Sequence, residues 1–95
     1  MRRAARVDRN HAEIVDALRK CGARVLDLSR VGRGCPDLLV HVGRLLVLVE
    51  VKTPQGTWTE AQERFREAGW PVITITDVQR VPQVIATLQK RSARS

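Results

Sequence analysis

Two carboxylates and one ammonium group lie near each other in adjoining apolar segments of this sequence. Asp37 begins one segment, Glu50 and Lys52 end the next, and only Gly43 and Arg44 separate the two segments. Glycine at the first position of a two-residue connection is typical of a type II′ hairpin turn. Counting outward from that turn places Asp37 directly opposite Glu50. The sequence therefore predicts two facing carboxylates.

Such a pair has a chemical use. Like charges directly opposite each other destabilise a sheet, and a divalent cation such as Mg²⁺ or Mn²⁺ would remove the repulsion. Strand alternation puts Lys52 on the same face as Glu50. Two carboxylates, a metal ion and an ammonium group suit phosphodiester hydrolysis. The alternative is a structural Glu50–Lys52 pair at a strand end, with Asp37 simply following Pro36 in a turn.

The elements that must position these groups follow from apolar spacing and from glycine and proline positions. The pattern predicts an α/β fold in the order α-β-β-β-α-β-α, with a mixed sheet flanked by helices. The unalternating apolar run at 45–49 predicts a central strand covered on both faces. The expected helices are residues 10–21, 59–68 and 82–90, and the expected strands are 24–28, 37–42, 45–52 and 71–76.

The composition predicts one globular domain over residues 1–95, with basic ends at about 1–7 and 91–95 that can be flexible. A net charge of +7 favours a polyanionic partner, and nucleic acid is the commonest one. No segment suits a membrane span, and no organic cofactor is expected. Two distant cysteines fit free thiols in an intracellular, cytoplasmic protein. The small size would suit a phage, in which case the compartment is the host cytoplasm.

Several short motifs together resemble the PD-(D/E)XK nuclease superfamily, and within it the virus-type replication-repair nuclease branch, VRR-NUC. The similarity runs from Gly32 to about Leu88. The resemblance implies a restriction-endonuclease-like core. The motifs are Gly34-Cys35-Pro36-Asp37-Leu38, Glu50-Val51-Lys52-Thr53, Gly56-Thr57-Trp58-Thr59 and Gln62.

The resemblance also implies roles for individual residues. Asp37, Glu50 and the backbone carbonyl of Val51 would bind Mg²⁺, for which Mn²⁺ can substitute, and Lys52 would serve the hydrolytic step. Small members of this family resemble junction-resolving enzymes and tend to be homodimers. This implies an endonuclease acting on branched DNA such as four-way (Holliday) junctions. The alternatives are a nicking or restriction-like nuclease on linear duplex, a non-catalytic nucleic-acid-binding module, and an accessory protein.

Two further candidates have competing interpretations. Gln62 matches a glutamine that lies near the catalytic site in the family, but it also fits a capping box with Thr59. Glu13 resembles a first-helix acid that supplements the metal site in some superfamily members. It equally fits a capping box with Asn10, where the first helix is expected to begin.

The remaining candidates concern contact with DNA. Arg30 and Arg33 lie on a glycine-containing loop just before Asp37 and are expected to contact phosphates. Arg44, in the hairpin turn at the far strand end, is expected to be merely solvated. Trp58 could stack on a base, but it begins an apolar helical stripe, so the spacing favours core packing.

Overall fold

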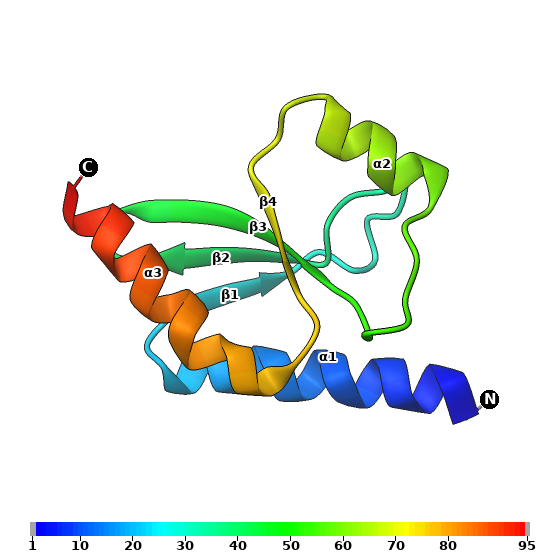
Figure 1. Ribbon diagram of the computed structural model, residues 1–95, viewed down its shortest axis with the longest axis horizontal. Coiled ribbons are helices and arrows are strands. Elements are labelled where there is room, and N and C mark those ends of the chain that lie inside the picture. Colours follow the sequence, from blue (N-terminus) through cyan, green and yellow to red (C-terminus); the bar gives the residue numbers. More distant parts are fainter. Residues whose placement is uncertain (1, 95) are drawn as a thin grey trace.

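The computed structural model describes residues 2–94, with side chains described for residues 9–94. The predicted order of elements is confirmed (Figure 1). The elements are α1 (Arg2–Lys20), β1 (Arg24–Asp27), β2 (Leu38–Val42), β3 (Leu45–Val51), α2 (Glu60–Glu67), β4 (Val72–Ile75), the 3₁₀ turn η1 (Val78–Arg80) and α3 (Val81–Arg94).

The four strands form one mixed sheet in the order β1-β2-β3-β4. β2 is antiparallel to both β1 and β3, whereas β3 and β4 are parallel because α2 forms the crossover between them. The hairpin register is as predicted, with Val42 opposite Leu45 and Leu38 opposite Val49. Gly43 has a positive φ of 60°, the conformation that such a tight turn requires of its first residue. The next residues outward are Asp37 and Glu50.

One face of the sheet is covered by α1 and α3, which contact each other. In Figure 1, α1 runs below the sheet, and α3 rises from beside α1 toward the left-hand end of β3. Their apolar stripes meet the inward-facing side chains of β2, β3 and β4, and this layer forms the hydrophobic core. The most deeply buried members, with at most 2% of their surface exposed, are Ile14, Leu18, Leu38, Val40, Val49, Ile75, Val81 and Leu88.

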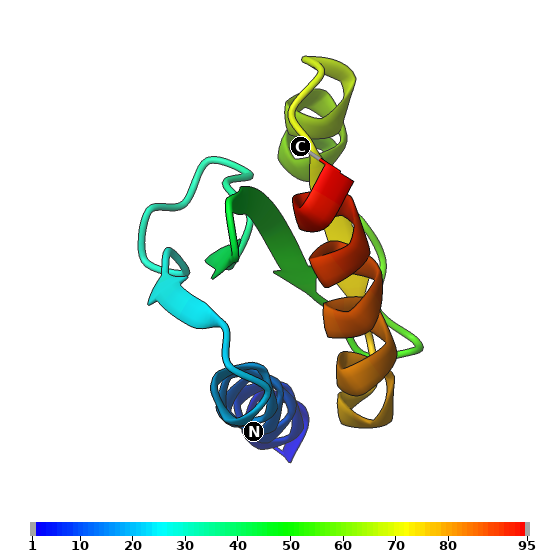
Figure 2. The same cartoon turned by 90° about the vertical axis from the view of Figure 1, so that its left-hand side faces the viewer.

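The opposite face is largely open. The two views agree that α2 lies on the other side of the sheet from α1, beyond the end of β3 (Figures 1 and 2). Leu26 and Leu46 on this face are each 58% exposed. The prediction that β3 is covered on both faces is therefore wrong. α2 has only 8 residues, and it covers the carboxylate end of β3 rather than the strand's length.

The first helix begins at Arg2 and not at Asn10. Asn10 lies within the helix, and its side-chain amide donates to the carbonyl oxygen of Lys52 at 3.2 Å. The capping box proposed for Asn10 and Glu13 is therefore wrong, because arginine and alanine before Asn10 are good helix formers that extend α1. Side chains of the basic end at 1–7 lie outside the described residues. None of the helices within 2–94 is long and apolar enough to span a membrane.

Candidate active site

The carboxylate of Asp37 is fixed by the backbone of the neighbouring strand. Its Oδ2 accepts a hydrogen bond from the Val51 N–H at 2.9 Å. Asp37 follows the fully buried Pro36 and precedes the buried Leu38, so the chain on both sides of it is anchored in the protein. Glu50 lies opposite Asp37, because the register pairs Leu38 with Val49 and these are the next residues outward.

Glu50 is the most unusual residue of the site, because it is a carboxylate with only 2% of its surface exposed. Its Oε1 accepts from the Gln62 Nε2 at 3.2 Å. Its Oε2 is buried and has no hydrogen-bond partner among residues 9–94. The pKa of Glu50 is raised from 4.5 to about 8, by burial first and then by the nearby Asp37 carboxyl, whereas Lys52 lowers it. A buried oxygen of this kind is costly unless a ligand satisfies it.

Lys52 extends from the end of β3 toward the start of α2. Its ammonium group donates to the Gln62 Oε1 at 2.7 Å and to the carbonyl oxygen of Thr57 at 2.9 Å. Gln62 therefore bridges Lys52 and Glu50, with its amide oxygen toward the cation and its amide nitrogen toward the carboxylate. The three side chains form one connected polar network.

The capping box predicted for Gln62 is confirmed, and the same side chain lies between Lys52 and Glu50, whereas a catalytic role for it stays a prediction. Its Oε1 accepts from the Thr59 N–H at 2.9 Å, and its own N–H donates to the Thr59 Oγ1 at 3.2 Å. This is a complete capping box at the start of α2. The same amide oxygen also accepts from Lys52, so the helix start and the polar network share one side chain.

The loop before Asp37 packs against α2 through a glycine. A side chain at Gly34 would overlap the backbone of Ala61 at the start of the helix. Gly32, Arg33 and Gly34 all have positive φ, at 76°, 57° and 79°, and the Cys35 N–H closes this turn on the Gly32 carbonyl at 3.0 Å. Glycine allows both the left-handed backbone and the close approach. Arg33 adopts the same backbone although it is not a glycine.

The donor set fits a hard divalent cation. Within the described residues no three His, Cys, Asp or Glu side chains come together as a metal cluster. The side-chain ligands that the site provides are therefore the two carboxylates of Asp37 and Glu50. Mg²⁺ is commonly held by one or two carboxylates, with the remaining positions filled by other oxygens. The unsatisfied Glu50 Oε2 next to Asp37 is the observation that supports a cation here. The carbonyl oxygen of Val51 belongs to the same strand end and is a candidate third ligand.

Glu13 is not brought to the carboxylate pair. It is exposed on α1, and α1 covers the core face of the sheet, whereas Glu50 alternates with the core residues Val49 and Val51 and so points to the other face. Arg30 and Arg33 are exposed on the loop before Asp37. Their expected contact with DNA stays a prediction.

Three features near the site were missed or misjudged from the sequence. Trp58 is half-buried and lies outside the apolar core, with its ring centroid 5.2 Å from the Lys52 Nζ, so the prediction of core packing is wrong. Asn10 holds the Lys52 carbonyl from α1. Burial, and then the charges of Glu50 and Asp37, raise the pKa of the Cys35 thiol. Its position two residues before Asp37 was the available signal.

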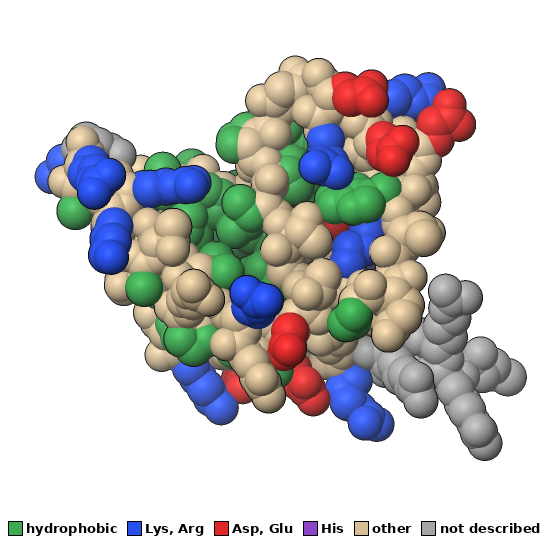
Figure 3. Space-filling model, in the orientation of Figure 1, with side chains coloured by type: hydrophobic (Ala, Val, Ile, Leu, Met, Phe, Trp, Pro, Cys, Tyr) green, Lys and Arg blue, Asp and Glu red, His purple; other side chains and the backbone are tan. Residues whose placement is uncertain are grey.

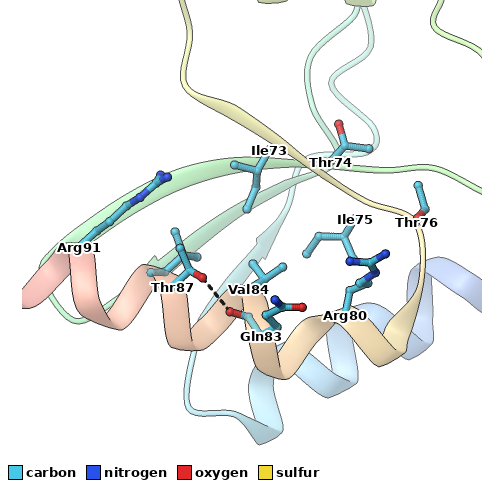
Figure 4. A pocket seen from close by; sticks show the side chains of 10 residues that line it. Ile73, Thr74, Ile75, Thr76, Arg80, Gln83, Val84, Thr87 and Arg91 are labelled. Carbon is cyan, nitrogen blue, oxygen red and sulfur yellow. Dashed lines mark hydrogen bonds between the residues drawn. The ribbon is translucent and has the colours of Figure 1, made fainter.

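A separate groove lies between β4 and α3, with a volume of about 380 Å³ (Figure 4). In Figure 3 apolar side chains are exposed in this hollow, and basic side chains lie around it. Ile73, Ile75 and Val84 line it, together with Arg80 and Arg91. No carboxylate, histidine or cysteine lines it, so it offers neither a metal ligand nor a general base. The carboxylate pair therefore remains the candidate site for chemistry.

A search of solved structures gave a close structural match. A protein described as "VRR_NUC domain" is 31% identical to this chain, and the superposition has a TM-score of 0.64. The match covers 84% of this chain and 94% of the other. No protein-family model matches the sequence, and no curated protein does. The similarity therefore spans nearly the whole of the solved domain and most of this chain.

Proposed function

This chain belongs to the VRR-NUC family and has its nuclease fold, and from that premise we propose that it is a divalent-metal-dependent DNA endonuclease. The observation that carries the proposal is the buried Glu50 carboxylate, whose Oε2 has no partner among residues 9–94. Asp37 lies opposite Glu50 in the hairpin register, and a fold gains no stability from such a pair. A bound cation would offset the repulsion between the two carboxylates.

Asp37, Glu50 and the carbonyl of Val51 would hold the cation. When bound, a divalent ion would supply an electrophile for a phosphoryl oxygen and a source of hydroxide at neutral pH. The backbone N–H of Val51 orients Asp37 by its 2.9 Å hydrogen bond. Gln62 orients Glu50 from the other side, at 3.2 Å. The side chains of the site are thus held before any substrate arrives, as electrostatic catalysis requires.

Lys52 supplies positive charge next to the carboxylates. Its ammonium group is fixed by Gln62 and by the Thr57 carbonyl. Such a fixed ammonium group can donate to a phosphoryl oxygen or to the attacking water while negative charge develops on the phosphate. Arg30 and Arg33 would bind the phosphates that flank the scissile bond, since both are exposed on the loop that leads to Asp37.

The open sheet face supports a homodimer with branched DNA as substrate. Leu26 and Leu46, each 58% exposed, lie on this face with the half-buried Leu39 and Leu48. A second copy of the chain would cover this apolar surface by a two-fold interface, in which the same patch serves both partners. Two copies would bring two sites to two strands, as cleavage of a four-way junction needs. No element within residues 9–94 stands apart as a base-reading unit, which favours recognition of DNA shape.

The first test measures cleavage of a labelled four-way junction and a matched linear duplex by the wild type and Glu50→Gln, with Mg²⁺, Mn²⁺ or chelator. We expect metal-dependent cutting of the junction and a loss of about a thousandfold in Glu50→Gln with DNA binding retained. Glu67→Gln, which removes an exposed glutamate from α2, is the matched control and should cut like the wild type.

Each outcome separates the alternatives. Cutting of the linear duplex alone would keep the catalytic site and reject the junction as substrate. Binding without cutting of either DNA, unchanged in Glu50→Gln, would identify a non-catalytic nucleic-acid-binding module.

Sedimentation of the wild type and Leu46→Lys tests the dimer, since a charge at that position should dissociate it. Val31→Lys, at a loop residue that is 61% exposed, is the control.

A further inference from the structure

The loop between β3 and α2 encloses the side chain of Lys52. The Gly56 N–H donates to the Thr53 carbonyl at 2.9 Å and closes a turn. A methyl group added at Gly56 would lie 3.4 Å from the Lys52 Cδ, so the backbone of this turn runs along the lysine stem. The next residue, Thr57, accepts from the ammonium group through its carbonyl oxygen. The loop therefore holds a side chain that would otherwise sample many rotamers.

Trp58 completes this enclosure. Its ring centroid lies 5.2 Å from the Lys52 Nζ, within the range of a cation–π contact. The ring also lies 4.5 Å from the Arg66 Cζ of α2. Trp58 is half-buried and outside the apolar core. The ring thus contacts two cationic side chains, which is unusual for a residue whose role is only to fill space.

We propose that Trp58 is a positioning residue that holds the Lys52 ammonium group in its catalytic orientation, an inference that rests on the proposed nuclease function. The Thr57 carbonyl and Gln62 occupy two of the three N–H donors of Lys52. The face of the Trp58 ring attracts the ammonium group electrostatically and uses none of its N–H donors. The third donor is left for the reacting phosphate. In this role Trp58 acts through Lys52 and not on the reacting atoms.

Arg66 provides the competing explanation, since the ring could act only as an attachment point for α2. The two roles predict different mutants. Trp58→Leu keeps apolar volume and removes the aromatic face from both cations. Arg66→Met keeps the Trp58–Lys52 contact and removes only the contact with α2. Trp58→Phe keeps a smaller aromatic face at the same position.

Steady-state cleavage of the junction by these variants measures the effect. We expect Trp58→Leu to lower kcat about tenfold, which corresponds to about 1.4 kcal/mol in the activation free energy, with KM and Tm little changed. Trp58→Phe should recover most of the loss, and Arg66→Met should keep kcat within about twofold. An unchanged kcat in Trp58→Leu would overturn the proposal. Equal losses in Trp58→Leu and Arg66→Met would also overturn it, in favour of helix attachment.

A second measurement does not depend on cleavage. The ring current of Trp58 should shift the ε-methylene protons of Lys52 upfield in the NMR spectrum of the wild type. The shift should persist in Arg66→Met and disappear in Trp58→Leu, with circular dichroism to establish that both variants fold. If the wild type cuts no DNA, the proposed function fails, and this shift still decides whether the ring holds the ammonium group. Absence of the shift in the wild type overturns the positioning role directly.

Discussion

The two sides of the sheet are held together by different forces. On one side, α1 and α3 bury apolar side chains such as Leu18 and Ile85 against the strands. On the other side, none of the 8 residues of α2 is buried. That helix is attached by the Gln62 hydrogen bonds and by the contact of Arg66 with the Trp58 ring.

This difference has a consequence for function. The side chains that attach α2 are the same ones that contact Glu50 and Lys52, so the helix and the candidate site depend on each other. A chain of this length has little apolar surface to bury, and its buried core lies on the α1 and α3 side of the sheet. The other face carries the charged groups of the candidate site at one end, beside the exposed side chains of Leu26 and Leu46. Substitutions below the sheet should therefore lower stability, and those above it should lower activity.

The largest expected effect lies below the sheet. Leu18→Ala removes a side chain with no exposed surface and should cost about 2–5 kcal/mol of unfolding free energy, because a cavity remains in the core. Phe65→Ala is its counterpart on α2, where the ring stacks on Trp70 with centroids 5.5 Å apart. It should cost about 1 kcal/mol. Chemical denaturation measures both, and equal losses would contradict the proposed division between the two sides.

Gln62 allows the two roles above the sheet to be separated. Gln62→Glu keeps an oxygen for the Thr59 N–H, as a capping box accepts either residue, but loses the donor to Glu50 and adds a like charge next to it. We expect cleavage to fall about a hundredfold with little change in Tm. Thr59→Val removes the capping hydroxyl and should cost about 1 kcal/mol of stability with activity largely kept. Full activity in Gln62→Glu would leave Gln62 with a capping role alone.

The register of the hairpin was predictable because a two-residue turn with a leading glycine leaves one pairing. That register is why Asp37 and Glu50 could be predicted to face each other, and the structure has the predicted pairing of Leu38 with Val49. The order of elements was predictable for a similar reason, since apolar spacing depends on local geometry. The catalytic roles of Asp37, Glu50 and Lys52 stay predictions until cleavage is measured.

What the sequence could not supply were contacts between distant segments. An asparagine before an apolar stripe fits a helix cap, but Asn10 donates its amide to Lys52, which lies 42 residues away in the sequence. The spacing of Trp58 fits a core face, because a pattern cannot distinguish an aromatic ring buried among aliphatic groups from one that lies over a cation. The apolar run of β3 likewise does not indicate which of its faces a helix will cover.

The pH dependence of stability tests the cost of the buried carboxylate. With chelator present, Glu50 should release its proton near pH 8 in the folded protein and near 4.5 when unfolded. Between these values the folded state binds more protons, so this group's contribution to unfolding free energy falls as pH rises. Glu50→Gln should therefore gain stability relative to the wild type from pH 5 to pH 8. Denaturation at each pH measures this, with Glu67→Gln as the control. If the difference in unfolding free energy between Glu50→Gln and the wild type stayed constant from pH 5 to pH 8, the raised pKa of Glu50 would be contradicted.

The smallest expected effect concerns Arg33, which lies on the loop before Asp37. It directly precedes Gly34, the residue that packs against α2. Arg33 has a φ of 57°, a conformation that glycine adopts at lower cost. Arg33→Gly should therefore raise unfolding free energy by about 1 kcal/mol and, by losing a phosphate contact, weaken DNA binding about threefold. It should also lower the slope of log K against log salt by about 1. Arg44→Gln, at the opposite strand end, should change neither quantity. A gain in stability with an unchanged salt slope would mean that Arg33 does not contact DNA, and that its strained backbone serves only to bring Gly34 against α2.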